Sequence, residues 1–181
     1  KQRRFSQRRS LFIGLVILLI CVLTLTAPSA WAISVQIREF PTPTASSGPA
    51  GITAGPDGNL WFTEAVGDKI GRISTAGTIT EFPVPTVGSS PWDITAGPDG
   101  NLWFTESVGN NIGRISTAGT ITEFPLPTTC GSSNGCGPSG ITAGPDGNLW
   151  FTEVYGNQIG RISAAGVTNE FPVATPNSGP A

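Results

Sequence analysis

The sequence predicts an all-β protein, a β-propeller of four-stranded antiparallel blades, and three observations predict it. The run GITAGPDGNLWFTE at residues 51–64 returns almost unchanged at residues 93–106 and 140–153. The copies start 42 and then 47 residues apart, a spacing typical of propeller blades. The chain also contains 24 Gly and 16 Pro, which interrupt it so often that no segment keeps helical spacing. A stacked array of β-blades accounts for all three features.

Each repeat reads as four short strands separated by turns. In the first copy the expected strands are residues 52–54, 60–63, 69–74 and 78–82. Pro56, Asp57 and Gly58 suit a tight turn between the first two strands, because proline presets φ and glycine accepts a positive φ. The second strand is rich in aromatic and β-branched residues. Pro83 ends the fourth strand because proline cannot donate to a ladder. The other two copies follow the same plan.

Residues 1–32 have the features of a secretory signal peptide. Residues 1–9 carry five basic side chains and no acid, residues 11–25 are almost purely apolar, and residues 30–32 read Ala-Trp-Ala. The alternative is an uncleaved anchor, but the apolar run of 15 residues falls short of the ~20 that span a bilayer. We therefore expect export, to the periplasm, the cell surface or the extracellular medium. Contact with a membrane is expected only through the leader, if it is retained.

Residues 33–181 are expected to form part of a propeller. The repeats occupy about 49–90, 91–137 and 138–176, and residues 177–181 begin a fourth. Residues 34–40 match the end of a repeat, and we expect them to be a latch strand that completes a closing blade. Three blades do not close a ring, since propellers have about 4–8. The chain therefore reads as a fragment of a larger parent, whose remaining blades would be its partners.

Charge and composition exclude several classes of function. Without the leader, five basic residues remain against twelve acids, a net charge of −7. That balance argues against nucleic acid as a partner, because phosphate binding needs clustered Lys and Arg. The chain has no His, so it has no catalytic triad and no Cys-His pair. Its glycine-rich runs are turns, because they lack the strand-to-helix context of a nucleotide loop.

The candidate binding residues lie on one rim of the expected propeller. In a four-stranded meander, the second-to-third turns share a rim with the links between blades, and these segments vary between copies. Variable loops on a rigid scaffold commonly carry recognition, so we expect a small-molecule, peptide or glycan ligand there. Trp92 occupies a position where the other copies have Ala50 and Ser139, and either contacts a ligand or covers the seam between blades. Further ligand-binding candidates are Ala50 and Ser139, at the position equivalent to Trp92, and Asp68 and Tyr155, in the variable turns.

Glu64, Glu106 and Glu153 end the second strand of each copy at the same rim. Three carboxylates at one height are a candidate Mg²⁺ site, because this cation prefers oxygen ligands. The alternative is a structural role for each, as a cap for its own blade or as the partner of the arginine in its repeat. These arginines are Arg72, Arg114 and Arg161. Presence in every copy favours the structural role. The neighbouring Trp-Phe pairs are expected to be core packing between blades.

Cys130 and Cys136 lie in an insertion, residues 129–138, that precedes the third copy. Two cysteines in one loop of an exported protein predict a disulfide that closes the loop. A metal site is the alternative, but no His and no second Cys pair accompany them.

The repeated run, followed by I-G-R-I-S-x-x-G-x-I-T-E-F-P-x-P, resembles the streptogramin B lyases, also called virginiamycin B lyases. The resemblance covers residues 34–181 and recurs in three copies. It implies a seven-bladed propeller. It also implies an enzyme class that opens a cyclic depsipeptide antibiotic by elimination at its ester, using Mg²⁺, a His acid or base and Glu ligands. That chemistry is coherent, because a cation polarises the ester while a base takes the α-proton.

The catalytic residues of the family do not carry over to this chain. The family's His residues follow the Pro of a blade-opening P-H-x-I turn, and its metal-binding Glu residues belong mainly to the last blade. The matching positions here are Ala50, Trp92, Ser139 and Ala181, and none is His. We therefore expect an exported propeller fragment that acts as a ligand- or partner-binding scaffold without catalytic residues of its own. The alternative is part of a Mg²⁺-dependent carbon–oxygen lyase that linearises streptogramin B antibiotics, with its catalytic blades beyond Ala181.

Overall fold

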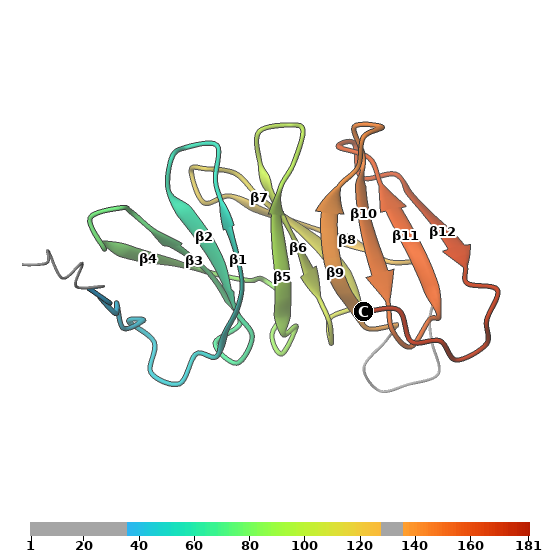
Figure 1. The fold of residues 1–181 in the computed structure, drawn as a ribbon, viewed down its shortest axis with the longest axis horizontal. Coiled ribbons are helices and arrows are strands. Elements are labelled where there is room, and N and C mark those ends of the chain that lie inside the picture. The colour runs from blue at the N-terminus through green and yellow to red at the C-terminus, as the bar shows by residue number, and fades with distance from the viewer. Residues whose placement is uncertain (1–35, 128–135) are drawn as a thin grey trace, which may run out of the picture. The chain divides into compact units, whose positions relative to one another are not determined.

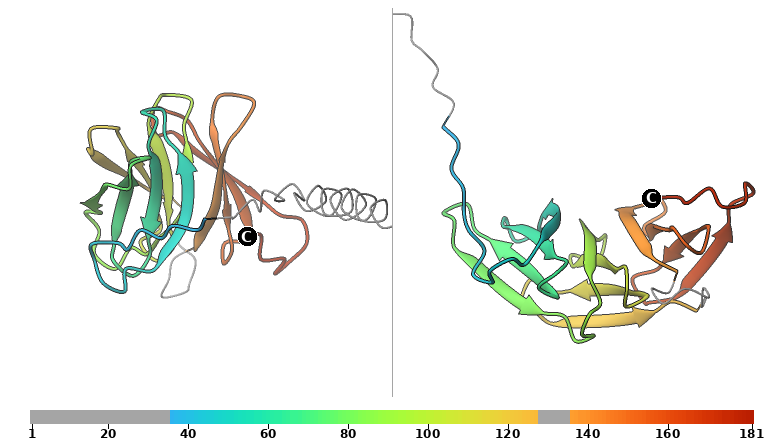
Figure 2. Two further views of the ribbon diagram at one scale, coloured as in Figure 1. Left: turned by 60° about the vertical axis from the view of Figure 1, so that its left-hand side comes forward. Right: turned by 90° about the horizontal axis from the view of Figure 1, so that it is seen from below.

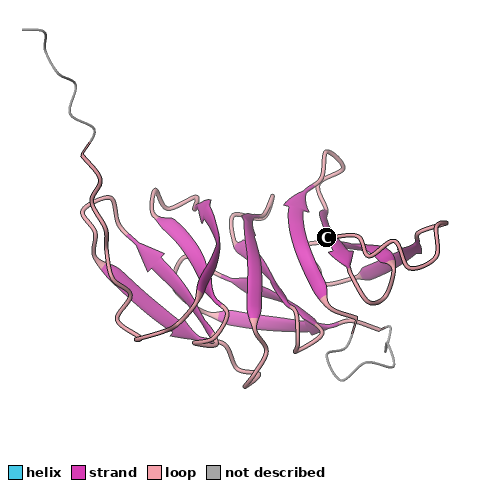
Figure 3. Cartoon of the chain, turned by 60° about the horizontal axis from the view of Figure 1, so that its bottom comes forward, coloured by secondary structure: helices cyan, strands magenta, loops and turns pink. Residues whose placement is uncertain are grey.

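Three four-stranded antiparallel sheets make up the fold (Figure 1). The computed structural model describes residues 36–127 and 136–181. Blade 1 contains β1 (Pro49–Ala54), β2 (Leu60–Glu64), β3 (Lys69–Ile73) and β4 (Ile79–Pro83). Blade 2 contains β5 (Pro91–Ala96), β6 (Leu102–Glu106), β7 (Asn111–Ile115) and β8 (Ile121–Pro125). Blade 3 contains β9 (Pro138–Ala143), β10 (Leu149–Glu153), β11 (Gln158–Ile162) and β12 (Thr168–Pro172). The described residues contain no helix (Figure 3), so none of them forms a helix that could span a membrane.

The blades lie side by side, in chain order, within residues 40–181. The first strands of neighbouring blades are in contact, β1 with β5 and β5 with β9. The right-hand view in Figure 2 shows these strands on the concave side of an arc, with β4 and β8 on the convex side. The predicted partial propeller of antiparallel blades is confirmed.

The turn between the first two strands of a blade is built by its own sequence. In blade 1 the Gly58 amide donates to the Gly55 carbonyl (3.1 Å), and Gly58 has a φ of 77°, where a side chain is disfavoured. The Asp57 carboxylate accepts hydrogen bonds from the Asn59 side chain (2.7 Å) and from the Trp61 indole (3.0 Å). The repeated P-D-G-N sequence therefore closes the hairpin and holds the tryptophan that follows it.

The core lies in the seams between blades. Trp61 is fully buried and stacks on Phe82, with ring centroids 5.6 Å apart. The Arg72 guanidinium lies 5.5 Å from the centre of the Trp61 ring, and its Nη1 donates to the Thr117 carbonyl of blade 2 (3.1 Å). The second seam repeats this arrangement with the equivalent residues of blades 2 and 3. Trp61 also shares this buried cluster with Phe104, from the Trp-Phe pair of the next blade's second strand, so these pairs pack between blades as the sequence predicts.

The expected latch strand is not formed by the described residues, although one of its side-chain contacts is present. Residues 36–40 are described but are not in a strand, and all three sheets already have four strands of their own. A strand exists only where its N–H and C=O groups find a ladder partner. Phe40 nevertheless packs on Gly77, as Phe82 packs on Gly119, since a Cβ added to either glycine would lie 2.1–2.2 Å from the phenyl ring. The side-chain contact of a preceding blade is therefore present without its strand.

One further sequence prediction, the length of the first strands, differs from the structure, and two others concern residues that the structure does not describe. The first strand of each blade is longer than expected, because β1 begins at Pro49, which pairs with Glu64, and a register irregularity separates it from Ile52. The predicted signal peptide and Cys130 lie outside the described residues. They remain predictions.

Replacing a seam tryptophan tests this core. Trp103→Ala should lower the free energy of unfolding by about 3–5 kcal/mol, because it empties a fully buried site. Trp150→Ala, the same change in blade 3, should cost clearly less, since Trp150 is only half-buried. Urea unfolding followed by circular dichroism measures both, and equal losses would contradict a core located between blades.

Candidate functional site

The variable rim comprises the second-to-third turn of each blade (residues 65–68, 107–110 and 154–157) and the links that lead into the blades. Each turn ends in a residue with a left-handed backbone. These residues are Asp68, Asn110 and Asn157, with φ of 50°, 55° and 53°. Their short polar side chains tolerate this conformation. The rim is therefore shaped by a repeated turn geometry.

These turn residues hold the links in place. The Asp68 carboxylate accepts hydrogen bonds from the Gly88 amide (2.6 Å) and the Ser90 amide (3.1 Å). The Asn110 side-chain oxygen accepts from the Cys136 amide at 2.8 Å. Asp68, a ligand-binding candidate from the sequence, thus has its carboxylate engaged by the backbone of the next link. Its position favours a scaffolding role over ligand contact.

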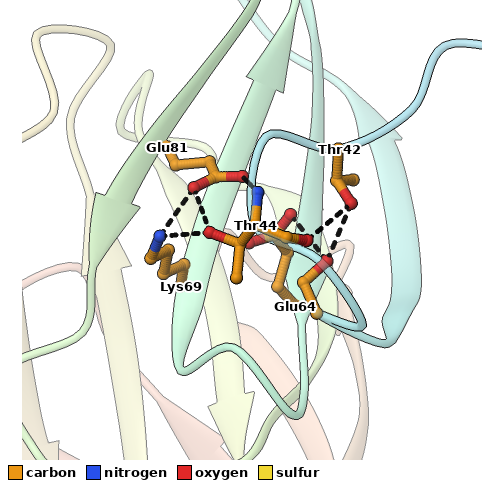
Figure 4. A network of polar contacts seen from close by, with 6 residues as sticks. Thr42, Thr44, Glu64, Lys69 and Glu81 are labelled. Carbon is orange, nitrogen blue, oxygen red and sulfur yellow. Dashed lines mark hydrogen bonds and ion pairs between the residues drawn. The ribbon is translucent and has the colours of Figure 1, made fainter.

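The segment that enters blade 1 is held in a comparable way (Figure 4). The Thr44 amide donates to one oxygen of Glu81 (2.8 Å), and the Thr44 hydroxyl donates to the other (2.6 Å). Lys69 pairs with the same carboxylate at 2.6 Å and donates to the Thr44 hydroxyl. In the next link Thr86 makes the same two bonds to Glu123. The links are therefore fixed on the blades they enter.

Trp92, Ala50 and Ser139 occupy equivalent positions at the start of the inner strands. The Thr63 hydroxyl donates to the Trp92 carbonyl (2.7 Å), and the Thr105 hydroxyl donates to the Ser139 carbonyl (2.7 Å). Trp92 is 49% exposed and belongs to neither buried core cluster. The structure thus presents an indole to solvent from a rigid strand.

The apolar surface of this rim contains one residue that the sequence predicts, Tyr155, and three valines that sequence reasoning missed. Tyr155 is 60% exposed, and its ring lies so close to Gly137 that a Cβ there would be 2.6 Å from it. Three valines of the turns and the link between blades 1 and 2 are also exposed. They are Val66, Val87 and Val108. The sequence shows each of these valines as an apolar residue within a loop. Single apolar residues are common on protein surfaces, so this pattern alone does not indicate a binding surface.

The three glutamates lie beneath this rim, each fully buried. Ser47 donates to Glu64 (3.0 Å), and Asn111 donates to Glu106 (2.8 Å). Among the described residues, neither oxygen of Glu153 has a hydrogen-bond partner. Within the described ranges, no group of three or more His, Cys, Asp or Glu residues could hold a metal ion. Each carboxyl group therefore sits in its own blade, and the three do not gather into a site.

Of the two structural roles left open for these glutamates, capping of the blade or pairing with the repeated arginine, the structure does not show the arginine pairing. The arginine nitrogens lie instead within 4.0 Å of the aspartates of the P-D-G-N turns. The pairs are Arg72 with Asp57, Arg114 with Asp99, and Arg161 with Asp146. Strand register explains this, because each arginine pairs across the ladder with the tryptophan near the start of the second strand. The glutamate lies at the opposite end of that strand.

Burial controls the protonation of the glutamates. Loss of hydration raises the pKa of Glu106 to about 7, although the Asn111 hydrogen bond opposes it. Burial also raises the pKa of Glu153 to about 7, with a smaller contribution from the charge of Glu170. Burial raises the pKa of Glu64 as well, against the hydrogen bond from Ser47. Glu106 and Glu153 therefore hold a proton in the fold up to about pH 7.

Cys136 takes the place in blade 3 that Ser47 and Ser89 take in the other blades. Its Cβ lies 3.3 Å from a Cβ built on Gly156, as the Cβ of Ser47 lies 3.1 Å from one built on Gly67. Cys136 is disulfide-bonded, so it cannot donate a hydrogen bond to Glu153 as Ser47 does to Glu64. Cys130 lies outside the described residues, and its pairing with Cys136 stays a prediction.

A shallow hollow of about 330 Å³ borders two of the ligand-binding candidates, because its lining includes Asp93 and Gly140, which directly follow Trp92 and Ser139. Its lining comes from blade 3 and one residue of blade 2, and includes none of the five predicted ligand-binding residues. The lining residues are Asp93, Gly140, Ile141, Thr142, Trp150, Phe151, Thr152 and Ile159. It belongs to the open face of blade 3, not to the rim.

Comparisons with known proteins agree on one family. Residues 30–181 match the model of the Virginiamycin B lyase family. The virginiamycin B lyase of Saccharopolyspora erythraea is 49% identical over 47 residues, which are 26% of this chain and 16% of the relative. The solved virginiamycin B lyase of Staphylococcus aureus superposes with a TM-score of 0.76 at 50% identity, over 80% of this chain and 48% of that one. The same values hold for its catalytically inactive variant with quinupristin. This chain thus spans about half the length of those solved enzymes.

The raised glutamate pKa values predict a specific pH dependence. Glu106 and Glu153 hold a proton in the fold up to about pH 7 but lose it near pH 4.5 when unfolded. The free energy of unfolding should therefore fall as pH rises from 4.5 to about 7, and change little above. Glu153→Gln should flatten this slope and stabilise the protein at pH 8, as measured by urea unfolding.

Asp146→Asn is the matched control for this prediction. Hydrogen bonds from Trp150 and Asn148 lower the pKa of Asp146 to about 2, below the pH window of interest. The slope between pH 4.5 and 7 should stay unchanged in this variant. A Glu153→Gln protein with the wild-type slope would show that the carboxyl group is hydrated or ionised in the fold.

Proposed function

Because the chain belongs to the virginiamycin B lyase family, we propose that it is a ligand-binding propeller segment whose variable rim holds a small molecule, peptide or glycan. The observation that carries the proposal is Trp92, 49% exposed on a strand whose backbone Thr63 anchors. An aromatic ring on a rigid element supplies contact area at a low entropic cost. Tyr155 and the exposed rim valines extend the same apolar surface.

The chain's own residues favour binding over catalysis. Elimination at an ester requires a base that reaches the α-proton, and the chain has no His. Glu106 and Glu153 have a pKa suited to a base, but both are fully buried and do not reach a ligand on the rim. Mg²⁺ is implied by the resemblance alone, and the described residues offer no set of ligands for it.

The alternative proposal is that the chain contributes part of a Mg²⁺-dependent lyase whose catalytic blades lie beyond Ala181. The 50% identity to the Staphylococcus aureus enzyme supports it, as does the quinupristin complex of an inactive variant of that enzyme. In that case the rim described above would supply substrate contacts. Export of the protein is likewise a proposal, which rests on the composition of residues 1–32.

A binding experiment separates these proposals. The full chain is titrated by calorimetry with quinupristin, a set of neutral oligosaccharides and a set of cyclic peptides. We expect at least one to bind, and Trp92→Ala to weaken it about tenfold, the effect of roughly 1.4 kcal/mol. The control is Val167→Ala, which truncates an exposed apolar side chain outside the rim. Binding unaffected by Trp92→Ala, or no binding at all, would refute the rim as the site.

The same samples test catalysis. Quinupristin incubated with the chain and Mg²⁺ is analysed by reversed-phase chromatography, because elimination changes retention without changing mass. We expect no ring-opened product above a buffer blank. Turnover would instead favour the lyase alternative and place a base within this chain.

A further inference from the structure

Cys136 and Glu153 are both fully buried beneath the second-to-third turn of blade 3. The Cys136 carbonyl accepts hydrogen bonds from two amides of this turn, at 3.0 and 3.2 Å, and the Ser47 and Ser89 carbonyls accept the equivalent pairs in the other blades. A Cβ built on Gly156 would lie 2.9 Å from the Glu153 Oε2 and 3.3 Å from the Cys136 Cβ. The cysteine side chain thus enters blade 3 near the carboxyl group, at the position that a serine has in the other blades.

Blades 1 and 2 supply their buried glutamate with a hydrogen-bond donor, but blade 3 does not. In blade 1 the Ser47 hydroxyl donates to Glu64 (3.0 Å), and in blade 2 an asparagine of the third strand is the donor. Cys136 is disulfide-bonded, so it has no S–H to donate. The counterpart of the asparagine is Gln158, yet among the described residues Glu153 has no partner on either oxygen.

The surroundings of Glu153 disfavour a negative charge. A fully buried carboxylate without a donor is costly, so the neutral acid is the stable form. The charged group that acts on it from β12 is Glu170, which opposes ionisation as well, and burial together with this charge raises the pKa of Glu153 to about 7. Its ladder partners on β11 and β9 are Gln158 and Pro138, which do not titrate. Tyr155, in the adjoining turn, is exposed.

We propose that Cys136 and Glu153 form a redox-linked proton switch, in which Glu153 is protonated while Cys136 is in its disulfide and ionised once that disulfide is reduced. A dithiol is the reductant. The S–S bond of the protein breaks, an S–S bond forms in the reductant, and two electrons and two protons pass to the two protein sulfur atoms. The Cys136 thiol then donates to the Glu153 carboxylate, as Ser47 donates to Glu64, and Glu153 releases its proton to solvent.

The two halves of the switch are linked reciprocally. A donor from Cys136 favours the ionised form of Glu153, so ionisation of Glu153 favours reduced Cys136 by the same factor. Reduction should therefore become easier as pH rises from 4.5 to about 7, the interval over which the buried acid is held neutral. The Tyr155 amide donates to the Cys136 carbonyl, so the switch is attached directly to the variable rim.

Equilibration of the full chain with reduced and oxidised dithiothreitol tests the proposal. Exchange between a dithiol and a disulfide moves no net protons at acid pH, so a pH dependence reports a linked group. At a fixed ratio of the two reagents, the ratio of reduced to oxidised Cys136 should rise about fivefold between pH 5 and pH 7, as expected for one hydrogen bond to a carboxylate. A small diselenide speeds the exchange, and differential alkylation with mass spectrometry reads Cys136 separately from Cys21 and Cys130.

Two glutamate variants identify the linked group. Glu153→Gln should remove the pH dependence. Glu106→Gln makes the same change in blade 2, whose glutamate has no cysteine beside it, and should leave the dependence as in wild type. A wild-type ratio that does not change with pH, or a dependence that survives in Glu153→Gln, would overturn the proposal.

A second pair of variants tests the donor without redox chemistry. Both carry Cys130→Ser, and they differ only in Cys136→Ser or Cys136→Ala. The hydroxyl introduced by Cys136→Ser takes the place of Ser47 and stabilises the Glu153 carboxylate. Between pH 4.5 and about 7, the free energy of unfolding should therefore fall less in this variant than in the one with Cys136→Ala. Equal slopes in urea unfolding would show that a donor at this position does not act on Glu153, and would also overturn the switch.

Discussion

The stack of tryptophan, phenylalanine and arginine in each seam is the interaction on which the rest of the structure depends. The Trp103 ring is held at its edge by Asp99 (3.0 Å), faces Phe124 at 5.4 Å, and carries the Arg114 guanidinium 5.5 Å from its centre. Arg114 in turn reaches the next blade. Trp103 thus links the turn of its blade, through Asp99, to the seam, through Phe124 and Arg114. A single sheet of this size cannot bury both its faces, so the blades are stable only when this stack joins them.

The repeated residues stabilise the blades, so the side chains of the rim can vary between copies. The links are anchored by the turn residues and by threonine-glutamate contacts, with distances repeated from blade to blade. Side chains such as Trp92 and Tyr155 can therefore differ between copies without altering the backbone beneath them. The glutamates show the cost of this arrangement, since each buries a carboxyl group with few or no partners. Their raised pKa values follow from that burial.

The blades and the rim could be predicted because both are coded locally. Turn residues at regular intervals and a second strand rich in aromatic and β-branched residues specify a four-stranded meander, and the meander decides which loops share a rim. Contacts between segments distant in the sequence were harder to predict. The sequence leaves open whether the glutamates pair with the arginines, and strand register places the arginines beside the aspartates of the turns instead. Residues 36–40 match a strand in sequence, yet form none, because strand formation requires a partner that sequence similarity does not supply.

The sequence by itself determined the blade: its strands, its turns and the tryptophan at its centre. Only the tertiary structure decided which of these identical residues are buried. The segment LWFTE occurs three times, but Leu60 is 42% exposed and Leu102 is not exposed at all. Trp103 is buried, whereas Trp150 is only partly covered. The physical reason is that burial belongs to a pair of surfaces, and a residue's own sequence does not state what packs against it.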